Sequence, residues 1–517
     1  MEEIKQIVQR LYPSKSEEAL QLITSLLHKY SFEGSRIPFT QKDLIVIMYP
    51  NHIQNGRAPL LDLHNFLHNS PFTGVHILPF FLSDGDEGFS VVNYKLIDPS
   101  FGTWKHIDEI SKKHRLMVDI ILNHTSTSHE WFKKFLERDP KYKEYYITST
   151  NKHPWSHVFR PRSSPLFHTY SFNGNPPVDV WTTFSDRQVD LNYRNPMVLK
   201  EMIEVALHYI QHGAEILRLD AIGYVWKKEN SSCLNIEETF LFVSLLRKIF
   251  DRIAPHVYLL TETIVPFKEN IKFLNYGSDI VYNVSLPLLL FHTLFNQNAK
   301  KISYWINDLN KIIRDKYFLN VISTHDGFPI PPVKGILNDE EINKIIELAK
   351  SRGAQFTFRN NKGNSEVYEI NSTLLSLLDK KYMFDQFLLF HSVLLTLPGI
   401  PAFYFNNLMI DENDYDSFYK TKTSRTLHRR RFNSLNLPKH KEQVRANLFN
   451  MIKLRKSISD LHPNIPVRAE EKNGMLIISR GKFKAYHNFT NEFKEVDNIQ
   501  IKPYGFTWLL NDIPFNI

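Results

Sequence analysis

Cysteine is almost absent from this 517-residue sequence, whose only example is Cys233. A single cysteine cannot form an intrachain disulfide, which excludes the small disulfide-stapled secreted domains. We therefore expect the chain to work in a reducing compartment, and we interpret Cys233 as a structural residue.

Long apolar runs are missing as well. No uninterrupted apolar stretch approaches the roughly 18 residues that a membrane-spanning helix requires. The first residues, Met1–Lys5, include two glutamates and contain no apolar signal core. We therefore expect a cytoplasmic protein without a membrane partner.

No large excess of one charge is present, since 63 basic residues stand against 55 acidic ones for a net charge of +8. The run Arg429–Arg431 could belong to a nucleic-acid-binding patch. However, no zinc-ligand cluster, helix-turn-helix or single-strand-binding signature accompanies it, so we expect no nucleic-acid partner. The weakly basic balance fits an enzyme that handles anions.

What is present fits a large globular protein. The length exceeds what one hydrophobic core usually supports, which predicts a large domain with inserted or appended smaller ones. Residues 1–40 predict an N-terminal helical extension of two helices, the first with Ile4, Ile7, Val8 and Leu11 on one face. Ser14 and Glu17 predict a capping box at the start of the second helix.

Eight short apolar runs recur along the chain, with helical stretches between them. Strands that alternate with helices predict a parallel sheet, and about eight of them suit a closed barrel better than an open sheet. The predicted fold class is therefore α/β, a (β/α)8 TIM barrel. The expected strands are residues 44–48, 75–78, 117–122, 216–219, 257–260, 280–282, 319–322 and 401–405.

Two further parts are predicted around the barrel. The interval after the third strand is long, and its section 155–188 is rich in Pro, Ser and aromatic residues, which predicts an inserted domain B at 125–195 over the barrel mouth. Alternating apolar residues after about residue 465 predict a C-terminal β-domain at 465–517. The barrel would then occupy residues 41–124 and 196–464.

Polar groups directly follow four of the expected strands. A lone Asp after a strand is commonly a helix N-cap. Four such segments on one barrel rim instead predict an active site, because the chemistry of these barrels lies at the carboxyl ends of the strands. The segments are Asp119–His124, Arg218–Ala221, Thr261–Thr263 and Thr324–Asp326.

Two carboxylates in these segments fit glycoside chemistry. Retention of configuration needs one carboxylate that attacks the anomeric carbon and another that protonates the leaving oxygen, about 5 to 5.5 Å apart. Asp220 and Glu262, at the ends of neighbouring strands, suit those roles. Arg218 precedes Asp220 by two residues on the same strand face, where its guanidinium can keep that carboxylate ionised and oriented.

In this order, the four segments resemble the four signature regions of the α-amylase superfamily of glycoside hydrolases, and the resemblance spans nearly the whole chain. Four other segments are similar to its sucrose phosphorylase branch, namely Val75–Phe81, Asp86–Ser90, Arg160–Arg162 and Trp181–Ser185. The helical extension, Gly335–Glu341 and Tyr368–Asn371 look closest to the glucosylglycerate phosphorylase-like enzymes.

The resemblance implies a role for each candidate site residue. It makes Asp220 the nucleophile, Glu262 the general acid/base and Asp326 the transition-state stabiliser that grips ring hydroxyls. The residues that it places around the glucosyl unit are Asp86, Phe89, His124, Arg218, His325 and Arg429. Of these, Asp86 and Arg429 would close the pocket together. On the acceptor side it places Phe184, Gln188 and Tyr224.

Arg160 and Arg162 match a basic loop that approaches phosphate in this branch. A phosphate dianion that attacks a glucosyl-enzyme needs positive charge to offset repulsion from Glu262 and Asp326. The alternative interpretation is an ordinary surface arginine pair with backbone contacts, and both interpretations stay open at this point.

The reaction that the resemblance implies is a double displacement between a small-molecule α-glucoside and inorganic phosphate. Asp220 forms a β-glucosyl ester while Glu262 protonates the departing oxygen, and phosphate then attacks from the same face to give α-glucose 1-phosphate. No cofactor is implied. Asn123 matches a calcium-binding position of true amylases, but this branch generally lacks the ion, so we expect no metal and interpret Asn123 as a scaffold residue.

The sequence departs from the family pattern at three places: Asn93 where Asp is usual, Ile264 where the glucosylglycerate branch tends to have Asn, and Phe328–Pro329 where Ile-Gly is usual. Two of these flank catalytic residues, so the natural acceptor stays open, as does the oligomeric state. The alternative functions are an α-glucosidase or transglucosidase of the same superfamily and a non-catalytic barrel subunit.

Overall fold

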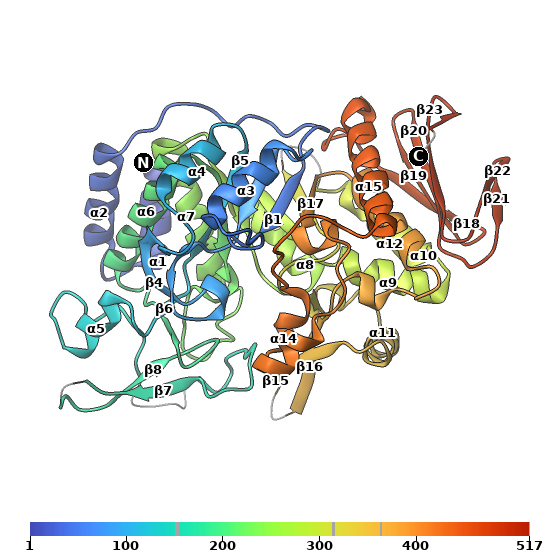
Figure 1. Ribbon diagram of the computed structural model, residues 1–517. Helices are drawn as coiled ribbons and strands as arrows, with labels where there is room; N and C mark the ends of the chain where they lie inside the picture. The colour runs from blue at the N-terminus through green and yellow to red at the C-terminus, as the bar shows by residue number, and fades with distance from the viewer. Residues whose placement is uncertain (150–154, 173, 313–315, 362–363, 516–517) are drawn as a thin grey trace.

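The computed structural model describes residues 1–149, 155–172, 174–312, 316–361 and 364–515. At its centre, eight parallel strands close into a barrel in the order β1-β17-β13-β12-β11-β10-β5-β2 (Figure 1). The predicted (β/α)8 fold is therefore confirmed. The strands are β1 (Ile45–Met48), β2 (Gly74–Ile77), β5 (Arg115–Ile121), β10 (Ala214–Asp220), β11 (Tyr258–Thr261), β12 (Ile280–Asn283), β13 (Tyr317–Asn320) and β17 (Ile400–Tyr404).

The barrel strands are apolar because helices cover their outer face and packed side chains fill the interior. Every residue of β1, β2, β11, β12, β13 and β17 is buried. All eight expected runs fall on these strands, with ends that differ by at most two residues. In the register of β10, Arg218 lies beside Asp119 of β5 and Leu260 of β11, which sets up the site described below.

Helices run outside the barrel between its strands. The longer ones are α3 (Pro59–His68), α4 (Trp104–Ser111), α6 (Pro196–Gln211), α7 (Glu237–Ile253), α9 (Leu286–Asn296), α10 (Lys300–Leu309), α11 (Asp339–Ser351), α12 (Met383–Thr396) and α15 (Lys439–Ser457). The short ones are α8 (Phe267–Asn270), α13 (Phe405–Leu408) and α14 (Tyr415–Thr421). Among the residues that the structure describes, no helix combines the length and apolarity needed to cross a membrane.

The N-terminal extension consists of α1 (Glu2–Leu11) and α2 (Ser16–Lys29), as predicted. α1 lies beside α7, and α2 lies beside α6 and α7 (Figure 1). Ile4, Val8 and Leu11 form the buried face of α1. The predicted capping box is wrong. A turn at residues 13–15 delays the start of α2 to Ser16, and no side chain caps its N-terminus.

The segment between β5 and α6 leaves the barrel. It runs through β6 (His124–Ser126), α5 (Glu130–Leu136), β7 (Phe167–Tyr170), β8 (Val178–Trp181) and β9 (Gln188–Asp190). β7 pairs with β8, and β9 pairs with β6 where the chain returns to the barrel. A small hydrophobic core that includes Trp155, Trp181 and the buried Cys233 stabilises this segment. The boundaries 125–195 for domain B remain a proposal.

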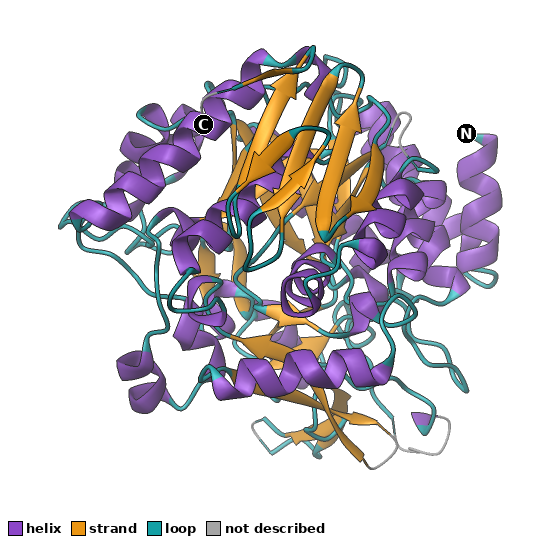
Figure 2. Cartoon of the chain, turned by 90° about the vertical axis from the view of Figure 1, so that its right-hand side faces the viewer, coloured by secondary structure: helices purple, strands orange, loops and turns teal. Residues whose placement is uncertain are grey.

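The C-terminal part is an antiparallel β-domain, as predicted. Its five-stranded sheet faces the viewer in Figure 2 and has the order β18-β19-β20-β23-β24. The strands are β18 (Arg468–Lys472), β19 (Met475–Arg480), β20 (Phe483–Asn488), β23 (Phe506–Leu510) and β24 (Ile513–Pro514), with a separate pair of β21 (Lys494–Val496) and β22 (Ile499–Ile501). Trp508 and His487 both hydrogen-bond Ser392 of α12, which joins the sheet to the barrel.

A second excursion follows β13, and the sequence did not predict its strands. β14 (Phe328–Pro329), β15 (Gln355–Asn361) and β16 (Asn364–Asn371) form a three-stranded antiparallel sheet in the order β14-β16-β15. Figure 1 shows this hairpin projecting from the same side of the barrel as β7 and β8, next to α14. Both excursions therefore reach the barrel mouth.

Candidate active site

A pocket opens at the carboxyl ends of the barrel strands. Its charged lining residues are Asp86, Arg162, Asp220, Glu262, Asp326, Glu369 and Arg425. It is also lined by the predicted residues Phe89, His124, Phe184, Gln188, Tyr224 and His325. Arg218, Arg429 and Arg160 do not line it, so the structure brings together most of the predicted site residues but not all of them.

Asp220 is the last residue of β10, which places its side chain at the pocket floor. Arg218 Nη1 donates to Asp220 Oδ1 at 2.6 Å and to Asp119 Oδ1 at 2.5 Å. Asp119 Oδ2 in turn lies 2.8 Å from His76 Nε2, and all four residues are buried. This buried chain holds the Arg218 guanidinium in place, where its charge stabilises the carboxylate form of Asp220.

Glu262 follows β11 and has different neighbours. Its Oε2 accepts the backbone N–H of Ala221 at 2.9 Å, while Arg218 Nη2 approaches only to 3.8 Å. Burial raises the pKa of both the Asp220 and Glu262 carboxyls against the opposing charge of Arg218. Because Arg218 bonds directly to Asp220 and only approaches Glu262, its charge favours a carboxylate on Asp220 more than on Glu262.

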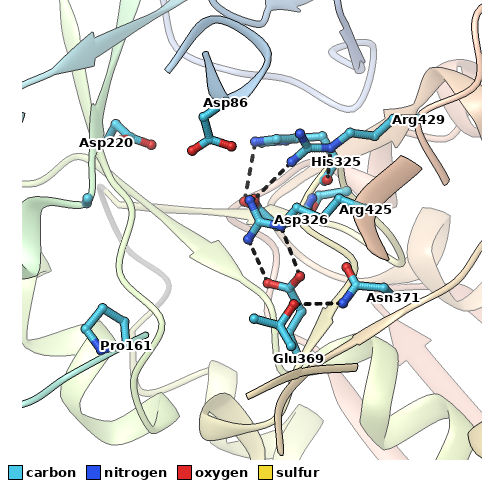
Figure 3. A network of polar contacts seen from close by, with 12 residues as sticks. Asp86, Pro161, Asp220, His325, Asp326, Glu369, Asn371, Arg425 and Arg429 are labelled. Carbon is cyan, nitrogen blue, oxygen red and sulfur yellow. Dashed lines mark hydrogen bonds and ion pairs between the residues drawn. The ribbon is translucent and has the colours of Figure 1, made fainter. Parts of the chain in front are cut away.

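Asp326 lies in the loop after β13 and faces three nitrogen-bearing side chains (Figure 3). Arg425 Nη1 is 3.1 Å and Arg429 Nη2 is 3.8 Å from its Oδ1, and His325 Nε2 is 3.4 Å from its Oδ2. Burial favours the neutral acid, but His325 and the two guanidiniums outweigh it and hold the pKa of Asp326 well below its ordinary value. Asp326 is therefore an ionised, well-supported acceptor of hydroxyl hydrogen bonds.

The rings of Phe89 and His325 form one wall of the pocket. They stack with centroids 5.4 Å apart and 3° between their planes. His124 Nε2 lies 3.0 Å from the carbonyl oxygen of Phe89, so both histidines are fixed against the same residue. An apolar ring flanked by two imidazoles suits a hydroxylated ring ligand.

Asp86 reaches the pocket from the loop between β3 (Phe81–Ser83) and β4 (Val91–Ile97). Gln188 Nε2 donates to Asp86 Oδ2 at 3.2 Å. Asp86 and Arg429, which we expected to close the pocket together, form no ion pair within the described residues. Instead Arg429 Nε donates to the backbone oxygen of His325 at 2.8 Å, and its guanidinium lies behind Asp326.

The part of the pocket that the resemblance predicts to bind the acceptor is aromatic and carries the guanidinium of Arg162. Phe184 and Tyr224 pack edge to face with centroids 5.5 Å apart, and Arg162 Cζ lies 5.7 Å from the Phe184 ring centroid. In the described part of the chain no carboxylate pairs with Arg162, whose Nη1 donates to the Pro161 oxygen at 3.2 Å. Arg160 differs, because it turns away to hydrogen-bond the Ser164 oxygen. Of these two arginines, only Arg162 therefore lines the pocket.

Comparison with known proteins identifies the family. The α-amylase catalytic-domain model matches residues 62–347, a range that covers more than half of the chain and includes Asp220, Glu262 and Asp326. The chain belongs to the α-amylase family.

Its relatives within the family include two glucosylglycerate phosphorylases. The Escherichia coli enzyme is 34% identical over 471 residues, which cover 87% of this chain and 83% of the relative. The Allomeiothermus silvanus enzyme is 33% identical over an alignment of 538 positions, gaps included, which covers 97% of each chain. The crystal structure of sucrose 6F-phosphate phosphorylase from Thermoanaerobacter thermosaccharolyticum has a TM-score of 0.77 at 24% identity, covers 90% of this chain and 96% of that one, and so shares its fold.

Three residues that line this α-amylase-family pocket were missed by sequence reasoning: Tyr368, Glu369 and Arg425. Tyr368 and Glu369 come from β16, and Arg425 comes from the short helix η7 (Ser424–His428). Tyr368–Asn371 stood out as a similar segment, but no spacing rule linked it to the barrel rim. Arg425 carried no signal beyond its place four residues before Arg429.

The three departures from the family pattern have different environments. Ile264 lines the pocket two residues after Glu262. Phe328 and Pro329 form β14, which pairs with β16 opposite Ile370 and Glu369. The Asn93 side chain accepts the backbone N–H groups of Lys95 and Leu96, away from the pocket. Ile264 and β14 can therefore shape the acceptor side, whereas Asn93 has a local role in β4.

A buried ammonium group lies beside the residue that matches the calcium position of true amylases. Lys227 Nζ donates to Asn123 Oδ1 at 2.6 Å and lies 2.7 Å from Asp190 Oδ2. Asn123 Nδ2 donates to the same Asp190 oxygen at 2.9 Å, and all three residues are buried. Lys227 thus compensates the charge of Asp190 and connects β9 to the barrel.

Proposed function

We propose that this chain is a retaining α-glucoside phosphorylase of the sucrose and glucosylglycerate phosphorylase type. The observation that carries the proposal is one pocket that combines the carboxyls of Asp220, Glu262 and Asp326 with the guanidinium of Arg162, which has no carboxylate partner among the described residues. The names of relatives that match most of the chain support the same reaction. The substrates would be a small-molecule α-glucoside and inorganic phosphate.

In the first proposed step, Asp220 attacks the anomeric carbon as the glycosidic bond breaks and the Glu262 proton passes to the departing oxygen. In the second step, a phosphate oxygen attacks the same carbon from the face that the leaving group vacated. Asp220 is released and α-glucose 1-phosphate forms. Asp326 and His325 would bind the ring hydroxyls in both steps, and this needs no cofactor.

The acceptor side supports an anionic or hydroxylated partner rather than a long sugar chain. Arg162 supplies one positive charge, while Phe184, Tyr224, Tyr368 and Ile264 supply apolar surface and two phenol hydroxyls. This combination suits phosphate in one direction and a small polyhydroxy leaving group in the other. The cytoplasmic location and the lack of nucleic-acid and membrane partners stay predictions.

Asp86→Ala is expected to weaken the use of every α-glucosyl donor. Loss of a charged hydrogen-bond acceptor at the pocket removes about 1 to 3 kcal/mol of donor binding. The measurement is kcat/KM for several donors with different leaving groups. Glu87→Gln is the control, because Glu87 pairs with Arg431 and does not line the pocket. Wild-type kinetics of Asp86→Ala on all donors would remove Asp86 from the glucosyl site.

Neutralising Arg162 is expected to impair phosphate use while sparing formation of the glucosyl-enzyme. Arg162→Ala should raise the phosphate KM about 10- to 100-fold, the cost of one charged hydrogen bond, and shift the product from glucose 1-phosphate toward free glucose. The ratio of the two products from α-glucosyl fluoride, measured at several phosphate concentrations, reports this shift.

Arg160→Ala is the matched control for Arg162→Ala, since Arg160 lies two residues away and turns out of the pocket. We expect its product ratio to equal that of wild type, and the double variant to equal Arg162→Ala. An unaltered ratio in Arg162→Ala would place anion selection elsewhere. If wild type itself gave only glucose at every phosphate concentration, the chain would be an α-glucosidase or transglucosidase.

A further inference from the structure

An ion chain runs from Asp326 to a buried carboxylate on the β15–β16 hairpin (Figure 3). Arg425 Nη1 lies 3.1 Å from Asp326 Oδ1. On its other side, Arg425 Nε and Nη2 donate to the two carboxylate oxygens of Glu369 at 3.1 and 2.8 Å. Such a two-point contact fixes the plane of a guanidinium as well as its position.

Both ends of this chain are anchored in the same small sheet. Glu369 is 2% exposed and pairs in register with Pro329, three residues after Asp326. Asn371, two residues farther along β16, donates to Thr357 Oγ1 at 2.9 Å and fixes the base of the hairpin. The hairpin and the Asp326 loop therefore form one supported unit.

The η7 segment supports the same loop from the opposite side. His428 Nε2 lies 2.9 Å from the His325 backbone oxygen, and Arg429 Nε donates to that oxygen at 2.8 Å. Arg425 and Arg429 both approach Oδ1 of Asp326. The other carboxylate oxygen of Asp326, Oδ2, lies beside His325 and is available to a ligand in the pocket.

We propose that Arg425, oriented by Glu369, is a positioning residue that fixes the Asp326 carboxylate for binding ring hydroxyls in the transition state. The inference rests on the proposed function, because it takes Asp326 as the residue that binds the reacting glucosyl unit. A carboxylate that must bind more tightly in the transition state than in the ground state gains from a fixed rotamer. Arg425 is not itself a catalytic residue.

Arg425 is poorly suited to bind phosphate. It lies between two carboxylates, which offset its positive charge and leave less of it to attract an anion. Arg162 lines the same pocket and, within the part of the chain that the structure describes, pairs with no carboxylate. The two guanidiniums therefore have separate roles in this proposal: Arg162 serves the acceptor, and Arg425 serves Asp326.

The test uses two assays. Hydrolysis of α-glucosyl fluoride measures glucosyl transfer without phosphate, and formation of glucose 1-phosphate measures glucosyl transfer to phosphate. Arg425→Ala should lower kcat about 100-fold in both assays, the loss expected when a reacting group is misplaced, with the phosphate KM unchanged. Arg425→Lys should restore part of kcat, since it returns the charge without the two-point contact.

Glu369→Gln should also reduce kcat in both assays, but by less than Arg425→Ala does, because the amide keeps one hydrogen bond to Arg425. Combined with Arg425→Lys, its effect should be smaller than the product of the single effects, which is the signature of residues that act as a unit. Simple loss of folding would not give this non-additivity or the partial rescue by lysine, and thermal unfolding of each variant checks for it.

The matched controls are Arg359→Lys and Glu366→Gln. Arg359 Nη2 pairs with Glu366 Oε2 at 2.7 Å on the same hairpin, and neither residue lines the pocket. These controls should keep wild-type kcat. A rise in phosphate KM at constant kcat in Arg425→Lys would overturn the proposal in favour of direct acceptor binding, as would additive Arg425 and Glu369 effects. Absence of glucose 1-phosphate in wild type would refute the proposed function, but the hydrolysis assay would still decide the role of Arg425.

Discussion

Asp220→Asn is expected to lower glucosyl transfer from any donor by about four to six orders of magnitude, the size of effect seen when a covalent nucleophile is removed. An amide cannot form the glucosyl ester, yet it matches the carboxylate in shape. Arg218 keeps its bond to Asp119, so the floor of the pocket should stay in place. The measurement is kcat/KM for α-glucosyl fluoride, with intact-protein mass to detect the glucosyl adduct.

The prediction requires that the variant fold normally. Its thermal unfolding temperature should stay close to that of wild type, because the amide has nearly the same volume as the carboxylate and Arg218 keeps its bond to Asp119. A folded Asp220→Asn protein that kept activity within tenfold of wild type would refute the nucleophile assignment and the double displacement with it.

Glu262→Gln is expected to affect donors according to their leaving groups. A general acid contributes about 10²- to 10⁴-fold, so donors with sugar or glycerate leaving groups should slow by that factor. Fluoride needs little protonation, and the variant should therefore still form the glucosyl-enzyme from α-glucosyl fluoride. Azide should attack that ester without base assistance and give α-glucosyl azide. Azide should not give this product with Asp220→Asn, because that variant forms no ester.

The pH profile gives an independent test of the same residue. Burial raises the pKa of Glu262, so the acid form persists toward neutral pH, and kcat/KM for a poor leaving group should fall as pH rises through that pKa. Glu262→Gln should lose this basic limb. A basic limb that persists unchanged in Glu262→Gln would mean that another group donates the proton.

The barrel and the carboxyls that line its pocket could be predicted because both depend on local sequence. Buried strands must be apolar, and a polar residue at the end of such a strand points into the barrel mouth, which is how Asp220 and Glu262 were found. The assignment of Arg160 and Arg162 to phosphate stays a prediction, and of the two only Arg162 lines the pocket. Adjacent residues of an irregular loop point in directions that no periodicity fixes.

The residues that position the Asp326 carboxylate could not be predicted, because their contacts join segments that are distant in the sequence. Glu369 reaches the site only because β16 pairs with β14, and Arg425 only because η7 packs against the loop that follows β13. Arg429 was expected opposite Asp86, but its bond to the His325 oxygen draws it behind Asp326. Such positions follow from tertiary packing, which local sequence propensity does not predict.

The most direct test of glucosyl transfer through a covalent enzyme intermediate is isotope exchange without any acceptor sugar. The protein is incubated with α-glucose 1-phosphate and labelled inorganic phosphate, and incorporation of label into the sugar phosphate is measured together with its anomeric configuration. A double displacement predicts exchange in wild type with the α configuration retained, and none in Asp220→Asn. Absence of exchange in active wild-type protein, or appearance of the β anomer, would contradict the account.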